Sequence, residues 1–286
     1  MEEIFPNYYG KFKCIADKCK HSCCIGWEID IDTDTFEFYN SLESELGERI
    51  RKNIEGDIPH FVLGEGERCP FLNKTGLCDI ISELGDGGLC DICNMHPRFC
   101  NFYDDFTEVG LGLCCEAATR IVLTENEKFS LDLPESAKND GFFAERAEAF
   151  EIIQDRSVSM LKRLEKLAEK YGLEFVFSGE ELYRFYSSLE RLDESWTREL
   201  EKLKGADAQS ALGREDLQIF FEQLAVYFIF RHFDGGVGFT LVSCFALAAM
   251  CSECESIDEM LDVVRMYSSE IEYSEENTEK VKAFLK

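Results

Sequence analysis

A chain of 286 residues that is 45% hydrophobic and 13% aromatic can bury a sizeable core, which excludes a disordered protein. Its 57 acidic side chains outnumber 30 basic ones, and the resulting formal charge of -27 would repel a phosphate backbone. The sequence therefore argues against nucleic acid as a partner.

The start of the chain, Met1-Glu2-Glu3, has neither the basic flank nor the apolar stretch of a signal peptide. We expect a cytoplasmic protein. We also expect no membrane partner, because the most apolar run, residues 237–251, is shorter than the roughly 20 residues that a membrane span needs. In a reducing compartment, clustered cysteines more often ligate metal or catalyse than form disulfides.

Short elements are expected in the first half, since glycine, proline, asparagine and aspartate interrupt residues 1–135 at short intervals. Apolar residues at helical spacing predict a helix over residues 33–46. Residues 102–113 can form a pair of strands, and residues 117–123 a short helix. Loops and bound metal are expected to shape this half.

Helical periodicity dominates from Phe142 onward. Apolar residues recur at helical intervals until Gly172, where a stop is expected. Residues 216–233 predict another helix, and the apolar residues 237–251 predict a buried one.

Two pairs of residues in this half have the spacing of a capping box. Ser178 with Glu181 predicts the start of a helix that extends toward Gly205, and Ser256 with Glu259 predicts another start.

These patterns predict a mainly α protein, in which an irregular cysteine-rich metal-binding N-terminal half is packed on an all-helical C-terminal bundle. The expected division assigns residues 1–135 to the cysteine-rich, metal-binding or iron-sulfur-binding region. Residues 136–286 form the helical bundle domain.

The 14 cysteines are far from evenly spread. Eleven lie between Cys14 and Cys115, and none lies between Cys115 and Cys244. Thiolates close in sequence, such as Cys90-x2-Cys93, can reach one metal centre because a tight turn brings their sulfurs together. Zinc and a four-iron cluster both take thiolate ligands, and spacing alone does not choose between them. The candidate metal ligands are Cys14, Cys19, Cys23, Cys24, Cys69, Cys78, Cys90, Cys93 and Cys114.

Other residues have simpler interpretations. Cys244 and Cys251 share one face of an apolar helix and are expected to be core residues. His21 and His96 lie in the cysteine region and could complete a metal shell, although a hydrogen-bonded loop histidine is the more common case. Arg98 can bind a cofactor carboxylate through its guanidinium or pair with a neighbouring aspartate. No catalytic triad is visible, and the catalytic residues remain unidentified.

Five blocks of residues follow one another between positions 9 and 120, and together they resemble the flagellin lysine-N-methylase family. His96 stands where the family often has tyrosine, and Cys115 where it often has proline. The blocks are Tyr9-x4-Cys14-x4-Cys19-x3-Cys23-Cys24-x-Gly26-Trp27, Cys69-Pro70-Phe71-Leu72-Asn73, Leu77-Cys78-Asp79-Ile80, Leu89-Cys90-x2-Cys93-x2-His96-Pro97-Arg98 and Cys114-x-Glu116-Ala117-Ala118.

This resemblance implies a protein-lysine N-methyltransferase that uses S-adenosylmethionine to methylate lysine side chains of flagellin, with an associated 4Fe-4S cluster. The residues themselves supply only the thiols. No glycine-rich turn of the nucleotide-binding type is present, so the sequence does not locate a pocket for S-adenosylmethionine. Two other hypotheses remain: a non-catalytic, zinc-stabilised binding module, and an iron-sulfur electron carrier.

Overall fold

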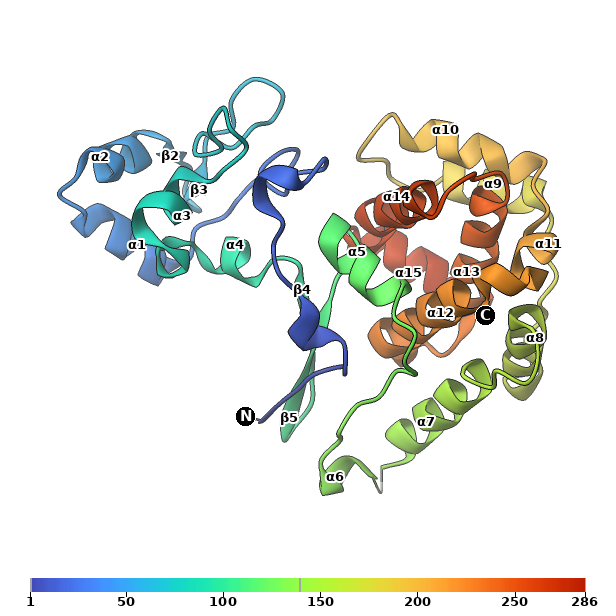
Figure 1. Ribbon diagram of the computed structural model, residues 1–286. Helices are drawn as coiled ribbons and strands as arrows, with labels where there is room; N and C mark the ends of the chain where they lie inside the picture. The colour runs from blue at the N-terminus through green and yellow to red at the C-terminus, as the bar shows by residue number, and fades with distance from the viewer. Residues whose placement is uncertain (1, 139, 286) are drawn as a thin grey trace. The chain divides into compact units, whose positions relative to one another are not determined.

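The computed structural model describes residues 2–138 and 140–285 and divides the chain into two compact units (Figure 1). The cysteine-rich unit comprises residues 13–99, and the helical unit joins residues 1–12 to residues 100–286. The division that we expected at residue 135 differs from these bounds, because residues 100–135 supply a strand and a helix to the helical unit.

The cysteine-rich unit contains only short elements. Each of its first two helices begins at a polar N-cap: Asp32 accepts a hydrogen bond from the backbone N–H of Thr35, and Ser44 accepts one from Gly47. The elements are α1 (Thr33–Ser41), α2 (Glu45–Lys52), β2 (Ile54–Glu55), β3 (His60–Phe61), α3 (Asp79–Leu84) and α4 (Asp91–Met95), with β2 and β3 antiparallel.

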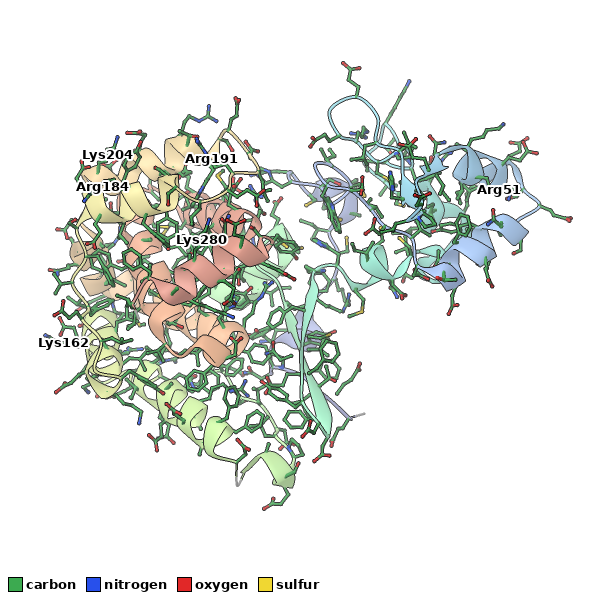
Figure 2. All side chains as sticks on the ribbon, turned by 180° about the vertical axis from the view of Figure 1, so that it is seen from behind. Arg51, Lys162, Arg184, Arg191, Lys204 and Lys280 are labelled. Carbon is green, nitrogen blue, oxygen red and sulfur yellow. The ribbon has the colours of Figure 1, made fainter. Side chains whose placement is uncertain are left out.

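The helix predicted over residues 33–46 is in fact two helices joined by a tight turn. A Cβ atom at Gly47 would lie 2.4 Å from the carbonyl oxygen of Leu42, so only glycine allows the chain to turn this closely. Arg51 closes the turn by donating hydrogen bonds to the carbonyls of Tyr39 and Leu42, each at 2.9 Å (Figure 2). The spacing of apolar residues correctly predicted helical structure here, but it did not predict the turn that separates the two helices.

A three-stranded sheet opens the helical unit. A strand pair is present as predicted, but it is β4 (Arg98–Phe102) and β5 (Phe106–Leu111), so the first strand begins four residues before the predicted range of 102–113. Strand β5 also pairs in parallel with β1 (Glu2–Ile4), giving the order β1-β5-β4. The helix predicted over residues 117–123 is confirmed as α5 (Glu116–Leu123).

The rest of this unit is helical, which confirms the mainly α prediction. Both predicted capping pairs are present: the hydroxyl of Ser178 accepts from the backbone N–H of Glu181, and that of Ser256 accepts from Glu259. The helices are α6 (Glu135–Lys138), α7 (Gly141–Ile153), α8 (Met160–Lys170), α9 (Gly179–Ser187), α10 (Trp196–Glu201), α11 (Ala208–Gly213), α12 (Gln218–His232), α13 (Gly238–Cys251), α14 (Ile257–Tyr267) and α15 (Glu275–Ala283).

Helix α13 is the centre of this unit, and every one of its residues is buried, as the apolar run predicted. It contacts α11, α12, α14 and α15, which surround it (Figure 1). Cys244 and Cys251 are fully buried in it, so their interpretation as core residues is confirmed. Within the described residues, no helix combines the length and apolar character that a membrane crossing would require.

Several surface cations pair with carboxylates on their own helices. Figure 2 labels Lys162, Lys204 and Lys280, whose ammonium groups lie 2.5–2.7 Å from the carboxylates of Glu165, Glu201 and Glu276. Such exposed pairs contribute little, typically about 0.2–1 kcal/mol each.

A buried carboxylate has a much larger role where α8 meets α12. The side chain of Glu222 is fully buried and accepts hydrogen bonds from Arg156 at 2.7 Å and from Arg163 at 2.6 Å. Because the side chain of Arg163 is only 2% exposed, this carboxylate supplies the counter-charge that compensates its burial.

We predict that Glu222→Gln lowers the free energy of unfolding by about 3 kcal/mol, because the substitution leaves a buried guanidinium without its counter-charge. Urea denaturation at pH 7 measures the effect. Glu165→Gln, which removes an exposed partner, is the matched control and should cost less than about 0.5 kcal/mol. Equal losses in the two variants would contradict a structural role for Glu222.

Candidate metal centre

Five of the predicted ligand cysteines gather in the core of the cysteine-rich unit. Two are fully part of that core and three pack against it, among the side chains of Tyr39, Phe61 and Phe71. The gathered thiols are those of Cys24, Cys69, Cys78, Cys90 and Cys93, hereafter the thiol cluster.

Short backbone pairings bring these cysteines together. The segment that contains Cys24 runs beside residues 67–69, and the N–H of Cys69 donates to the carbonyl of Cys24 at 2.9 Å. Leu72 and Cys78 form an antiparallel bridge, and the Asn73 side chain closes the loop between them by accepting from the N–H of Leu77 at 3.1 Å. This loop returns the chain to the core at Cys78, nine residues after Cys69.

The other two cysteines of the thiol cluster come from one short helix. Cys90 is the N-cap of α4 and Cys93 lies in its first turn, so the x2 spacing places both thiols at the same helix end. Cys93 donates a hydrogen bond to Cys90, which lowers the pKa of Cys90 and raises that of Cys93. The thiol of Cys90 therefore loses its proton more readily than that of Cys93.

Burial and nearby hydrogen bonds give the remaining thiols different acidities. Burial raises the pKa of Cys69 to about 12 and also raises that of Cys78. For Cys24, a hydrogen bond from Cys23 is the largest influence and brings the pKa down to about 7, with the positive charge of Arg68 adding to the effect. The thiol cluster thus includes a sulfur that is readily deprotonated and others that are not.

The sulfurs of the thiol cluster lie in one core, but no three of them are close enough together to bind a single metal ion. Across residues 2–138 and 140–285, no three cysteine sulfurs all lie within 4.8 Å of one another. A tetrahedral zinc site, with Zn–S bonds of about 2.3 Å, holds its sulfurs roughly 3.8 Å apart. An iron-sulfur cluster takes one cysteine per iron, so its ligand sulfurs stand farther apart.

The first three predicted ligands lie outside the thiol cluster, on the surface of the same unit. Cys14 and Cys23 are exposed, and Cys19 is half-buried with its thiol donating to the carbonyl of His21 at 3.2 Å. Cys23 is nevertheless linked to the thiol cluster, since it hydrogen bonds to Cys24.

Arg98, the predicted cofactor-binding residue, is half-buried and donates to the carbonyl of Asn94 at 3.1 Å. Nearby, the rings of Trp27 and His96 lie 5.9 Å apart, and Trp27 packs against the core that holds the thiol cluster. Burial lowers the pKa of His96 to about 4, so this imidazole is neutral at physiological pH.

A second group of possible ligands, which sequence reasoning missed, lies on the surface of the cysteine-rich unit. Glu28, Asp30 and His60 place one ligand atom each within 4.8 Å of the others. All three are exposed or half-buried, and the Nδ1 of His60 donates to the carbonyl of Ile58 at 3.0 Å. We assign no metal to this group, because exposed acidic groups of this kind are common without one.

Cys114, the last predicted ligand, belongs to the helical unit. Its thiol hydrogen bonds to the hydroxyl of Tyr273 at 2.8 Å, and burial raises its pKa to about 12. Cys115 is the N-cap of α5, and Cys100 lies on β4.

Next to Cys114 lies a buried polar network that no motif had indicated. Tyr227 accepts a hydrogen bond from Arg231 at 2.7 Å and donates to the carboxylate of Glu272 at 3.0 Å. His232 also donates to this carboxylate, at 2.7 Å. Glu272 ends a π-helical turn, Ser268–Glu272, a form that often occurs at functional sites.

Glu272 holds this network together as a buried anion. Burial alone would raise its pKa, but the charge of Arg231 and the hydrogen bond from His232 outweigh burial, so the pKa of Glu272 lies below its usual value of 4.5. Burial also lowers the pKa of His232, which is consistent with a neutral imidazole that donates to a carboxylate.

We predict that Glu272→Gln lowers the free energy of unfolding at pH 7 by about 3 kcal/mol, because Arg231 loses its buried counter-charge. Since the folded pKa is lowered, the stabilisation is fully present above pH 4.5 and is lost as the pH falls through the folded value. Urea denaturation at pH 7 and pH 3.5 should show the variant converging with the parent at the acid end.

The matched control is Glu276→Gln, which removes an exposed partner of Lys280 from the adjoining helix. It should change stability by less than about 0.5 kcal/mol at either pH. A gap between parent and Glu272→Gln that persists unchanged at pH 3.5 would show that the carboxylate charge is not the cause.

Fold and site together define a mainly helical protein with a separate small unit whose core is rich in thiols. Curated proteins of similar sequence include the lysine-N-methylases of Salmonella typhimurium and Salmonella choleraesuis, each 26% identical over 145 residues, covering 46% of this chain and 35% of the relative. Flagellar biosynthetic protein FliU of Salmonella muenchen is 27% identical over 146 residues, covering 46% of this chain and 84% of that protein.

These relatives confirm the resemblance to the flagellin lysine-N-methylase family. The match spans about a third of the length of the two lysine-N-methylases. No family model matches the chain, and no solved structure matches it either.

Proposed function

We propose that this chain takes part in S-adenosylmethionine-dependent methylation of lysine side chains on flagellin, with an iron-sulfur cluster held by the thiol cluster. The observation that carries the proposal is the gathering of five cysteines from four separate segments in one small core. The names of the relatives supply the reaction and the flagellar context.

The thiol cluster has the chemistry that a 4Fe-4S cluster needs. It offers five thiols for four irons, and its half-buried sulfurs lie among apolar side chains that keep water away. Cys24, Cys78 and Cys93 pack against the core from its edge, so a metal group there remains within reach of a substrate.

Bound S-adenosylmethionine would supply a methyl group on a positively charged sulfur, and the cluster a centre for electron transfer or Lewis-acid chemistry. The chain itself must attract the target lysine and hold its amine near that methyl group. A net charge of -27 favours the approach of a cationic side chain. A lysine amine must also lose its proton before it can attack, a step that a carboxylate could assist.

The first experiment identifies the metal. We expect protein purified without oxygen to be brown and to contain iron and acid-labile sulfide. Cys78→Ser and Cys93→Ser should each reduce the iron content, and the double variant should reduce it by more than about tenfold, because it leaves only three thiols of the thiol cluster for four irons. Cys254→Ser, which changes a half-buried cysteine outside the thiol cluster, should retain full iron content. Colourless protein that contains zinc would replace the proposal with a zinc-stabilised binding module.

The second experiment tests catalysis. Flagellin incubated with the iron-loaded chain, a reductant and S-adenosylmethionine labelled in its methyl group should gain label on lysine. Cys93→Ser should reduce the transfer by more than about tenfold, whereas Cys254→Ser should transfer label as the parent does. Iron-loaded protein that takes up electrons but transfers no methyl group would favour an electron carrier instead.

A further inference from the structure

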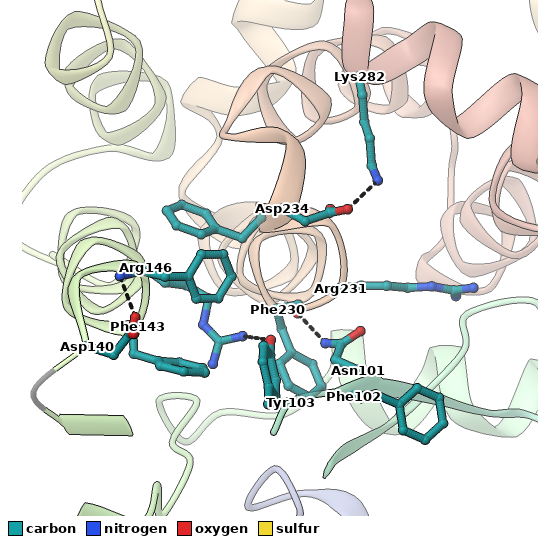
Figure 3. Close-up of a pocket in the computed structure, with 12 residues that line it drawn as sticks. Asn101, Phe102, Tyr103, Asp140, Phe143, Arg146, Phe230, Arg231, Asp234 and Lys282 are labelled. Atoms are coloured by element: carbon teal, nitrogen blue, oxygen red, sulfur yellow. Dashed lines mark hydrogen bonds and ion pairs between the residues drawn. The ribbon is translucent and has the colours of Figure 1, made fainter. Parts of the chain in front are cut away.

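The helical unit contains a cavity of about 450 Å³ between β4, α7, α12 and the end of α15 (Figure 3). Its size lies within the range of small-molecule sites. Six of its twelve lining residues are aromatic: Phe102, Tyr103, Phe142, Phe143, Phe230 and Phe233.

Buried interactions hold this wall in place. Arg146, only 1% exposed, forms a two-fold hydrogen bond with the fully buried Glu108, and it also donates to the hydroxyl of Tyr103 at 3.3 Å. Asn101 donates to the carbonyl of Phe230 at 3.0 Å, which ties β4 to α12. Because Glu108 neutralises Arg146, the aromatic floor of the cavity is rigid and carries little net charge.

One ring is not used for packing. The side chain of Phe102 is 77% exposed although it lies on a strand, and in Figure 3 it projects from the cavity rim. An exposed ring at the mouth of an aromatic cavity can stack on a flat ligand without giving up packing contacts in the core.

The opposite rim presents charges of both signs. The ammonium of Lys282 lies 2.9 Å from the carboxylate of Asp234 and 3.1 Å from that of Glu279 (Figure 3). Its stem passes close to Gly235, where a Cβ atom would lie 2.9 Å from the Lys282 Cδ. Asp140 adds a second exposed carboxylate to the lining.

We propose that this cavity is the binding site for S-adenosylmethionine, with the adenine ring stacked on Phe102, the cationic groups facing Asp234 and the carboxylate facing Lys282. The inference rests on the proposed function for the identity of the ligand. Aromatic faces attract flat bases and also cationic centres such as a sulfonium. A ligand that has a flat ring and charges of both signs can therefore interact with the aromatic residues and with both charged groups of the rim.

The target lysine alone fits the cavity less well. Its aliphatic stem has no flat face to stack on Phe102, and a lysine side chain carries no carboxylate that could face Lys282. A lysine would also leave much of the 450 Å³ unfilled.

The test is isothermal titration of S-adenosylmethionine, and of S-adenosylhomocysteine, into the iron-loaded 286-residue chain. Phe102→Ala should weaken binding about tenfold, because loss of a base-stacking ring has effects of that order. Leu192→Ala, which truncates an apolar side chain 60% exposed elsewhere in the helical unit, is its control.

Asp234→Asn should weaken binding about fivefold through loss of a charged partner. Its matched control is Glu279→Gln, since Glu279 pairs with the same Lys282 but does not line the cavity. Glu279→Gln should bind S-adenosylmethionine as tightly as the parent does. Equal weakening in Glu279→Gln and Asp234→Asn would mean that both act by changing the position of Lys282, and that Asp234 does not itself contact the ligand.

The outcomes separate the site from the function. Parent affinity in both Phe102→Ala and Asp234→Asn, together with intact methyl transfer to flagellin, would overturn the assignment of this cavity and leave the function standing. Absence of any binding to the parent, together with absence of methyl transfer, would overturn both. Weakened binding in these two variants and parent affinity in both controls would support the site.

Discussion

The structure of the cysteine-rich unit depends on the burial of thiols in place of ordinary apolar side chains. Cys69 and Cys90 occupy core positions beside Tyr39, Phe61 and Phe71, and the helices around them are too short to be stable without that core. A buried thiol that has no metal remains protonated, as the raised pKa of Cys69 indicates. Metal binding releases such protons, so metal affinity and the stability of this unit are coupled.

The helical unit depends on a different constraint: carboxylates buried in its apolar bundle need partners of opposite charge. Glu108, Glu222 and Glu272 are all fully buried, and each is matched by arginine, with histidine as a further partner in the last case. The same pairs organise the candidate site. Glu108 fixes the wall of the aromatic cavity, while Arg231 both lines that cavity and belongs to the network beside Cys114. Stability and site geometry therefore rest on the same few ion pairs.

Sequence patterns predicted what depends on neighbours along the chain. The capping pairs at Ser178 and Ser256, the buried helix over residues 237–251 and the paired thiols of Cys90 and Cys93 all follow from local spacing, and the structure contains each of them.

Features that depend on distant contacts were missed. The turn between α1 and α2 follows from the approach of Gly47 to Leu42, and the grouping of residues 100–135 with the helices follows from strand pairing and from α5 contacts with α12 and α14. The buried position of Glu272 could not be predicted, because the sequence does not distinguish a buried glutamate from an exposed one. Whether the predicted cysteines bind metal is a matter for the experiments on iron content.

The parallel pairing of β1 with β5 makes the cysteine-rich unit an insertion within the helical unit. Glu2 is aligned with Phe106, so about a hundred residues must be spanned before this edge of the sheet can close. The entropic cost of closing a flexible loop rises with the logarithm of its length. A cysteine-rich unit that folds first would shorten that loop, and a metal bound there, as we propose, would thereby influence the order in which the whole chain assembles.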